Sequence, residues 1–468
     1  MADLIIAGKY VVTMDKRRRV IEDGAVVIEE GRIIALGKSQ EMKTQYDADR
    51  VIEGKKYLVL PGLVDAHTHV FQCLGRGLGD DLPVEEWAEK SMYPLAKVMT
   101  RDEFYWAAKL NALEMIKSGT TTFADSHFIH IDKYSIDGIA DGTLESGLRA
   151  LIVRATQSRS PEEFIEDIVT AKRETKRVFN KYNGREGRIT VVPEVISFLR
   201  SDEEFILEMK QLADELGNGL HAHVSETLDR YKTIKSRTGL GEIEYIEKLG
   251  ILDKNLLMAH VIWVSSKEIV AIKKANAKVA HNPVSNQYLA DGYADIPLMR
   301  ALDITVGIGC DGASSNNNQD MIEAMKLCAL MHKTHTLNAS VLTAEDVLKM
   351  ATIEGAKALR MEETIGSLEI GKRADFAVID LEKPHLTPCP RPISNLVYSA
   401  NGSDVVYTIV DGKILMEERS VTTLDEQRIL EKTEEITTEL IVKSNLSELV
   451  QKGEFNIYGM GNFAPNNP

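Results

Sequence analysis

From Leu58 onward, the sequence alternates between short apolar runs and longer segments with helical periodicity. There are eight apolar runs, namely LVLPGLVDAHTH, GTTTFADSHF, RALIVRATQ, RITVVPEVIS, GLHAHVSET, NLLMAHVIWV, AKVAHNPVSN and ITVGIGCDGASS. Apolar strands that each lead into a helix are typical of parallel strands that helices bury on both faces. Eight such units predict an α/β fold of the (β/α)8 TIM-barrel type. An open doubly wound sheet is the alternative, but no G-x-G-x-x-G motif follows any of these runs.

The two ends of the chain have a different pattern. Residues 1–58 and residues 366–422 consist of short β-rich runs that are broken by Gly and Asp turn signals. We therefore expect both segments to join in one small β-sandwich, beside a barrel that spans residues 59–365. Residues 423–468 are predicted to form a charged helix followed by a tail.

The composition limits the class of function. The 468 residues are 44% apolar and 27% charged, which is ordinary for a globular protein. The net charge of −15 argues against nucleic-acid binding, which needs clustered Lys and Arg. The N-terminal apolar run is too short for a signal peptide, and no run approaches the roughly 18 apolar residues of a membrane helix. We expect a cytoplasmic protein that acts on a small molecule, without a nucleic-acid or membrane partner.

Side chains that can bind metals stand at the ends of several apolar runs. His67 and His69 end the first run, and residues two apart on a strand point to the same face. His223 ends the fifth run, His260 the sixth and Asp311 the eighth. In a barrel, these strand ends meet at the mouth where active sites are built. An isolated H-x-H pair usually indicates hydrogen-bonded core histidines, whereas this ordered set predicts a site for a transition metal.

The sequence resembles the amidohydrolase superfamily, in the branch of ATZ/TRZ-type aminohydrolases that includes methylthioadenosine and S-adenosylhomocysteine deaminases and s-triazine hydrolases. The resemblance covers nearly the whole chain, through the motifs PGLVDAHTH, LGRGLGDDLPVEEW, SGTTTFADSHF, HAHVSET, HNPVSNQYLADG, GCDGASSNN and GKRADFAVID. It implies that one divalent ion, zinc first and iron second, is held by His67, His69, His223 and Asp311. Binuclear relatives carry a carboxylated lysine on the fourth strand, and RITVVPEVIS contains no lysine.

The resemblance also implies catalytic roles around the metal. Glu226 resembles the proton shuttle of the branch, which protonates a ring nitrogen and later the leaving amine. His260 is expected to orient the hydroxide that forms on the metal, although it could also be a fifth ligand or a core histidine. Asp311 is expected to accept a hydrogen bond from the same hydroxide. His221 shares a face with His223 and could compete as a ligand, but the family pattern places it deeper.

Six further residues are weaker candidates for contacts with the substrate. They are Trp87, Asp125, His127, Glu194, His281 and Asn286. Trp87 should anchor a loop that closes over the pocket. Asp125 and His127 end the second strand, where a structural role is equally reasonable. For His281 and Asn286, support of the site is favoured over contact with the substrate.

These features predict an aminohydrolase, an enzyme that hydrolyses an exocyclic C–N bond of a cyclic amidine with a metal-bound hydroxide. Adenosine-type members carry a ribose-binding Glu where this chain has Ala96, and a His where it has Glu194. We expect the Glu194 carboxylate at the mouth, and a free amino-purine, pterin or triazine in preference to the matching riboside. The alternatives are a 5′-substituted adenosine deaminase, an s-triazine hydrolase and a non-catalytic barrel. The resemblance also suggests a homo-oligomer.

Overall fold

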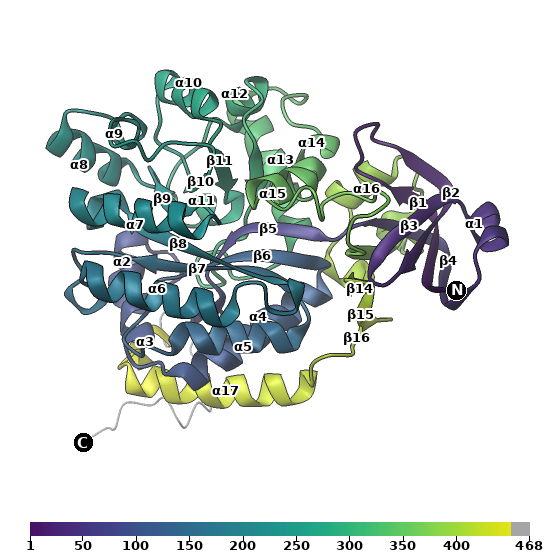
Figure 1. Ribbon diagram of the computed structural model, residues 1–468, viewed down its shortest axis with the longest axis horizontal. Helices are drawn as coiled ribbons and strands as arrows, with labels where there is room; N and C mark the ends of the chain where they lie inside the picture. The colour runs from purple at the N-terminus through teal and green to yellow at the C-terminus, as the bar shows by residue number, and fades with distance from the viewer. Residues whose placement is uncertain (451–468) are drawn as a thin grey trace.

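The computed structural model, which describes residues 1–450, is a parallel barrel joined to a separate mixed sheet (Figure 1). The expected tail lies outside the described residues. The barrel strands are β5 (Leu63–Thr68), β6 (Thr120–His127), β7 (Arg149–Thr156), β8 (Ile189–Ser197), β9 (Leu220–Val224), β10 (Leu256–His260), β11 (Lys278–His281) and β12 (Val306–Ile308). Neighbouring strands pair in parallel and in chain order. The predicted (β/α)8 fold is confirmed.

The barrel closes where the chain after β12 meets β5. The backbone N–H of Asp311 donates to the carbonyl of His67 at 2.9 Å, and that of Gly309 donates to His281 at 2.9 Å. Gly309 comes so close to β5 that a Cβ atom there would lie 2.8 Å from the carbonyl oxygen of His67. Only glycine permits this approach of two backbones. The closure of the barrel therefore coincides with the expected metal ligands.

Helices cover the outside of the barrel. They are α4 (Arg101–Lys117), α5 (Ser135–Ser146), α6 (Ile168–Tyr182), α7 (Glu203–Leu216), α8 (Leu228–Thr238), α9 (Glu242–Lys248), α10 (Ser266–Ala275), α11 (Pro283–Tyr288), α12 (Ile296–Ala301), α13 (Met321–Thr336), α14 (Ala344–Met350) and α15 (Ile353–Ala358). Local sequence sets several ends. The side chains of Asp167, Asp202 and Thr227 cap the first turns of α6, α7 and α8. Gly147 and Gly217 end α5 and α7 in the left-handed conformation.

The N- and C-terminal strands pair with each other beside the barrel, on the right in Figure 1. Their order is β16-β15-β14-β13-β4-β1-β2-β3. The strands are β1 (Ala2–Val12), β2 (Val20–Glu29), β3 (Arg32–Lys38), β4 (Ala48–Pro61), β13 (Phe376–Asp380), β14 (Val405–Val410), β15 (Lys413–Glu417) and β16 (Ser420–Val421). Helix α1 (Ser39–Gln45) packs on this sheet, and α16 (Pro392–Tyr398) lies between β13 and β14 in the chain. The two chain ends meet at the antiparallel pair β4–β13, within one continuous sheet.

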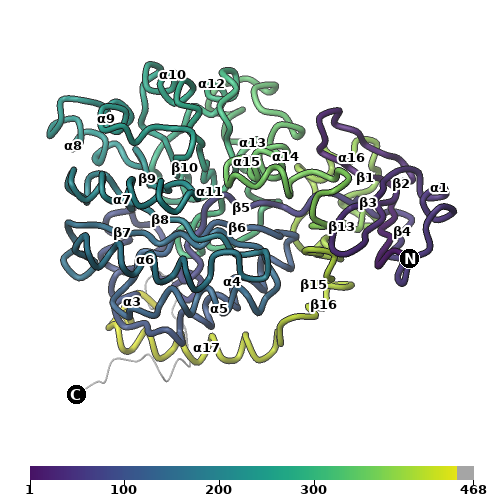
Figure 2. Tube along the Cα trace, viewed as in Figure 1, coloured from purple at the N-terminus to yellow at the C-terminus, as the bar shows by residue number. Residues whose placement is uncertain are grey.

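Two features hold the sheet and the C-terminal helix against the barrel. Arg149, at the start of β7, is buried between Asp375 at 3.1 Å and Asp411 at 2.8 Å, two residues that flank strands of the small sheet. Helix α17 (Glu426–Lys443) runs along the barrel beside α4 (Figure 2). Lys117 of α4 lies 2.7 Å from Glu426 of α17. The short helix α18 (Ser447–Val450) follows.

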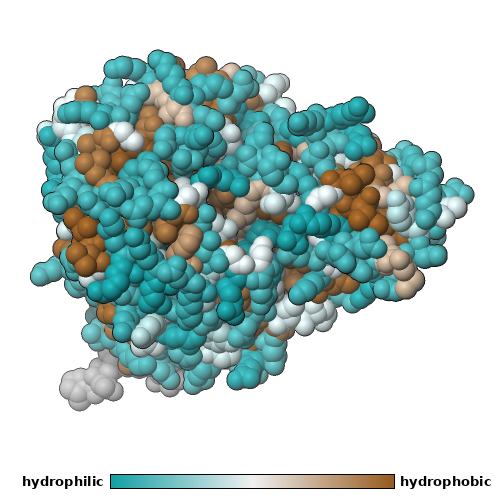
Figure 3. All heavy atoms as spheres, in the orientation of Figure 1, coloured by the Kyte–Doolittle hydropathy of each residue, from teal (hydrophilic) through white to brown (hydrophobic). Residues whose placement is uncertain are grey.

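The face of the molecule shown in Figure 3 is mainly hydrophilic. Hydrophobic side chains on this face form separate patches, as is ordinary for protein surfaces. Within residues 1–450, no helix combines the length and the apolar character that are needed to cross a membrane.

Candidate active site

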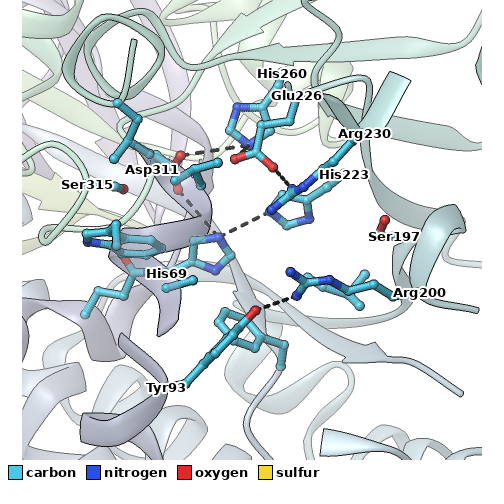
Figure 4. A pocket seen from close by; sticks show the side chains of 17 residues that line it. His69, Tyr93, Ser197, Arg200, His223, Glu226, Arg230, His260, Asp311 and Ser315 are labelled. Atoms are coloured by element: carbon cyan, nitrogen blue, oxygen red, sulfur yellow. Dashed lines mark hydrogen bonds and ion pairs between the residues drawn. The ribbon is translucent and has the colours of Figure 1, made fainter. Parts of the chain in front are cut away.

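The four expected metal ligands lie together at the mouth of the barrel, and Figure 4 shows His69, His223 and Asp311 among them. His67 and His69 come from the end of β5, His223 from β9, and Asp311 from the turn after β12. Asp311 Oδ1 lies 3.7 Å from His67 Nε2 and 3.5 Å from His69 Nε2. His69 Nε2 lies 3.3 Å from His223 Nε2. The four side chains are buried, and the ligand atoms of His67, His69 and Asp311 all lie within 4.8 Å of one another.

Whether these residues fit a metal can be judged from the hydrogen bonds of the histidine ring nitrogens that would not bind the ion. A metal-binding histidine usually donates its second ring N–H to an acceptor, which leaves the remaining lone pair for the ion. His69 Nδ1 lies 2.6 Å from the carbonyl oxygen of Ser126, and His223 Nδ1 lies 2.9 Å from Glu194 Oε1. His67 Nε2 is buried without a hydrogen-bond partner among the described residues. The donor set therefore fits a divalent cation.

The backbone turns sharply where the strands deliver these side chains. His260 has φ of 71° and Asp311 has φ of 64°, both in the left-handed region that residues other than glycine rarely adopt. Such conformations cost on the order of 1–3 kcal/mol and persist where the surroundings enforce them. At Asp311 two hydrogen bonds enforce this conformation. Its backbone N–H donates to the carbonyl of His67, and its Oδ1 accepts the backbone N–H of Gly312 at 2.8 Å.

Glu226 and His260 stand beside the candidate ligands. Glu226 Oε1 lies 3.7 Å from His260 Nε2, which lies 3.9 Å from Asp311 Oδ2. His260 Nδ1 is 3.0 Å from Asn286 Oδ1, so that its Nε2 faces the other two residues. The second oxygen of Glu226 pairs with Arg230. Burial is the largest single influence on Glu226 and would raise its pKa, but the combined charges of Arg230, His260, His223 and Arg200 lower the pKa to about 2. The resting carboxylate is therefore ionised and can act as a base.

A pocket opens above these groups. Its wall combines apolar side chains with a larger number of polar and charged ones. Besides His69, His223, Glu226, Arg230, His260 and Asp311, the lining residues are Gln72, Val84, Trp87, Ala88, Tyr93, Phe128, Ile196, Ser197, Arg200, Leu289 and Ser315. A concave site in which polar groups converge beside apolar surface is typical of small-molecule binding. The segment with α2 (Val84–Trp87) and α3 (Tyr93–Lys97) supplies one side of the wall.

Tyr93 and Arg200 form a polar pair in this wall, which the sequence analysis did not anticipate. Arg200 Nη1 lies 2.5 Å from the hydroxyl of Tyr93 (Figure 4). Ala96 is fully buried and stands outside the pocket wall, so its small side chain does not shape the pocket directly. Arg230 was missed as well. It lies in the first turn of α8, four residues after Glu226, which itself precedes the helix, so helical spacing gave no direct signal of their ion pair.

Of the six weaker candidates, all of them in the described part of the chain, Trp87 alone lines the pocket. Its indole N–H donates to the carbonyl of Ser314 at 3.0 Å. Asp125 and His127 lie beneath the pocket. Asp125 accepts the backbone N–H of Val70 at 2.9 Å, and burial raises its pKa to about 7.

The remaining weaker candidates contact other protein groups. His127 Nε2 lies 2.9 Å from the hydroxyl of Ser135, His281 Nε2 lies 3.2 Å from His332 Nε2, and Asn286 contacts His260. The expectation of a Glu194 carboxylate at the mouth is wrong. Glu194 is fully buried, because its position on β8 points it into the barrel below His223.

Known proteins resemble this chain in sequence over most of its length. The profile of the amidohydrolase family matches residues 58–415. The chain is 41% identical over 446 residues to a 5′-deoxyadenosine deaminase of Methanosarcina mazei. This alignment covers 95% of this chain and 100% of the relative. It is 37% identical over 444 residues to a 5-methylthioadenosine/S-adenosylhomocysteine deaminase of Syntrophomonas wolfei, with coverage of 94% and 100%.

Solved structures show the same architecture. A zinc-bound adenosine deaminase from Xanthomonas campestris superposes with a TM-score of 0.88 at 26% identity, over 94% of this chain and 99% of the other. The zinc complex of atrazine chlorohydrolase from Arthrobacter aurescens has a TM-score of 0.88 at 24% identity, over 93% and 100%, and shares the fold. With a family profile that spans most of its length and curated relatives that match it from end to end, the chain belongs to the amidohydrolase family.

Proposed function

We propose that this protein is a metal-dependent deaminase of adenosine-like substrates, which releases ammonia from the adenine ring of nucleosides modified at the 5′ position. The observation that carries the proposal is the end-to-end identity of 41% to a 5′-deoxyadenosine deaminase. The site supports the proposal, because three histidines (His67, His69 and His223) and two acidic side chains (Asp311 and Glu226) lie together beside the pocket. The comparisons thus favour the adenosine-type alternative over the free heterocycle preferred from the sequence.

One divalent ion would be held by His67, His69, His223 and Asp311. Zinc is the first choice, because imidazole nitrogens and a carboxylate suit it and because two structural neighbours contain zinc. When bound, the ion supplies Lewis acidity, which lowers the pKa of a coordinated water molecule to about 7.

The chain's own residues move the protons. Glu226, ionised at rest, accepts the proton of the attacking water and donates it to the ring nitrogen next to the reacting carbon. A second transfer through the same carboxylate lets the amino group leave as ammonia, so that water is consumed and the ring keeps a carbonyl. His260, fixed by Asn286, and Asp311 hold the attacking oxygen in line. General acid-base catalysis of this kind contributes about 10²–10⁴-fold in rate.

The outer part of the pocket suits a nucleoside. Apolar residues such as Phe128, Ile196 and Leu289 can pack against a purine ring. The hydroxyls of Tyr93 and Ser197 and the guanidinium of Arg200 offer hydrogen bonds to ribose hydroxyls. Charge-assisted hydrogen bonds are worth about 1.5–3 kcal/mol each, so these groups can replace an acidic ribose contact.

The test is ammonia release by zinc-loaded protein from 5′-deoxyadenosine, 5′-methylthioadenosine, adenosine, adenine and an aminotriazine. We expect the 5′-modified nucleosides to exceed adenine in kcat/KM by roughly tenfold or more, which corresponds to about 1.4 kcal/mol. The Glu226→Gln variant, prepared in parallel, shows that the activity belongs to this chain. A tenfold preference for adenine or the triazine would overturn the nucleoside assignment and restore the free heterocycle.

A further inference from the structure

Glu194 of β8 is a fully buried carboxylate below the candidate metal ligands. A buried charge is costly unless it is paired and hydrogen-bonded. Glu194 Oε1 lies 2.9 Å from His223 Nδ1, and Oε2 accepts the hydroxyl of Ser126 at 2.6 Å. His221 Nδ1 lies 3.0 Å from the same Oε1, although its N–H points away from the line between the two atoms. Two imidazoles and one hydroxyl therefore surround this carboxylate.

These neighbours connect Glu194 with the other two expected ligands. His221 stacks on His67 with an interplanar angle of 11°, and its Nε2 lies 3.2 Å from His67 Nδ1. Ser126, whose hydroxyl donates to Glu194, also accepts the Nδ1–H of His69 at its backbone carbonyl. One carboxylate is thus linked, directly or through a neighbour, to His67, His69 and His223, the three histidines of the proposed metal site.

One assignment of ring protons is consistent with these contacts. His223 carries its proton on Nδ1 in a hydrogen bond to Glu194, and His67 carries its proton on Nδ1 toward His221 Nε2. His221 then carries its own proton on Nδ1, which lies 3.0 Å from Glu194 Oε1 without an aligned hydrogen bond to it. His69 likewise carries its proton on Nδ1, toward Ser126. The Nε2 lone pairs of the three expected ligands then all point into the space beside Asp311. The assignment places two imidazole Nδ1 atoms within 3.0 Å of one oxygen of Glu194, whose carboxylate accepts a hydrogen bond from His223 and places negative charge beside the N–H of His221.

We propose that Glu194 is a positioning residue of the metal centre, which holds His223 directly and His67 through His221 in the tautomers that offer Nε2 to a divalent cation. The inference rests on the proposed metal site and deepens it. Glu194 also places a second negative charge near that of Asp311. Two carboxylates balance the charge of a divalent ion, which matters in a buried site where an uncompensated charge is costly.

The experiment measures zinc affinity without substrate. Wild-type protein and the Glu194→Gln variant are stripped of metal and titrated with zinc against a chromophoric chelator. The neutral Gln side chain removes the negative charge of Glu194, and its NH2 group is a donor that cannot accept the imidazole N–H groups. We therefore expect zinc to bind about 10–100-fold more weakly. The matched control is Glu268→Gln, another buried Glu, whose hydrogen bonds come from Ser265 and Ile243. We expect it to bind zinc as the wild type does.

A second variant keeps the proposal testable if Glu194→Gln fails to fold. His221→Phe retains a ring on His67 but removes the acceptor of the His67 Nδ1 proton, and we expect a smaller loss of zinc affinity. Unchanged zinc affinity in folded Glu194→Gln, or in His221→Phe when the first variant does not fold, would overturn the role of Glu194. A wild-type protein that binds no zinc would instead contradict the proposed metal centre itself. The two failures are therefore distinguishable, and neither depends on deaminase activity.

Discussion

Asp311 and His67 are joined both through the backbone and through the side chains. The N–H of Asp311 donates to the carbonyl of His67 at 2.9 Å, and the carboxylate lies 3.7 Å from His67 Nε2. The first bond closes the barrel between its last and first strands, and the second contact belongs to the candidate metal site. The position of the site is therefore set by the same junction that completes the fold.

The first prediction concerns Asp311. The Asp311→Ala variant should lose its bound ion and its activity, because the carboxylate is the one acidic group among the four proposed ligands. Elemental analysis of purified protein should find one zinc per wild-type chain and much less in the variant. Asp15→Ala, which breaks a 2.6 Å ion pair with Arg19 in the turn between β1 and β2, should keep its zinc. Two tightly held ions per chain, or full activity without metal, would contradict the ligand assignment.

The second prediction concerns Glu226. We expect Glu226→Gln to bind zinc normally and to lose about 10²–10⁴-fold in kcat, because the amide cannot carry protons. Steady-state ammonia release and metal content are measured on the same preparation. Glu268→Gln serves again as the buried-glutamate control. Near wild-type turnover in Glu226→Gln would remove this residue from the mechanism.

The third prediction concerns the pH dependence that Arg230 imposes on Glu226. The ion pair with Arg230 keeps the pKa of Glu226 at about 2, below its usual 4.5, so the carboxylate is ionised throughout the neutral range. In Arg230→Met, burial is no longer opposed by this charge, and the pKa should rise. The acid limb of the kcat/KM profile should then move to higher pH, with activity falling as the pH drops through the new pKa. Arg230→Lys keeps the charge and should leave the limb near its wild-type position.

The same pair contributes to stability with a defined sign. Because the pKa of Glu226 is depressed in the folded state, its contribution is present above pH 4.5 and is lost as the pH falls toward 2. Urea denaturation at several acidic pH values should show a smaller decline in the stability of Arg230→Met than in that of the wild type. An equal decline in both proteins would show that Arg230 does not set this pKa.

The fourth prediction concerns the contact between the barrel and the small sheet. Arg149 is buried between Asp375 and Asp411, and Arg149→Met leaves the buried Asp375 without this cation, whereas the partly exposed Asp411 keeps Arg373 at 3.5 Å. Removal of one partner from a buried ion pair costs roughly 3–5 kcal/mol, which urea denaturation can measure. Lys90→Met, which breaks an exposed pair with Glu86, should cost about 0–1 kcal/mol. Equal effects of both variants would show that Arg149 does not stabilise the contact.

Much of the architecture could be read from the chain because the relevant signals are local. The alternation of apolar runs and helices predicted eight parallel strands, and the structure contains them in chain order. The H-x-H spacing at the end of β5 placed His67 and His69 on one face. Glu226 could be named because it follows His223 by three residues in a recognisable motif.

The substrate side of the pocket could not be read in this way. Tyr93 and Arg200 are 107 residues apart, and each looks like an ordinary surface residue in its own segment. Ala96 attracted attention as a departure from a family pattern, yet its side chain stands outside the pocket wall. Which side chains share a pocket depends on how loops fold over the barrel, and loop geometry leaves little periodic signal in a sequence.

Glu194 illustrates the difference between what the sequence determines and what only the tertiary structure decides. The sequence by itself determined that β8 is an apolar strand carrying a single acidic side chain, and that histidines end β5 and β9. Only the tertiary structure decided that this side chain points inward below the ligands. There Glu194 contacts His223, which is 29 residues away in the chain. Glu194 is also linked through His221 to His67, and those two histidines are 154 residues apart. The physical reason is strand register, since a shift of one residue reverses the face to which a side chain points. That register is set by the packing of the whole barrel rather than by any local segment.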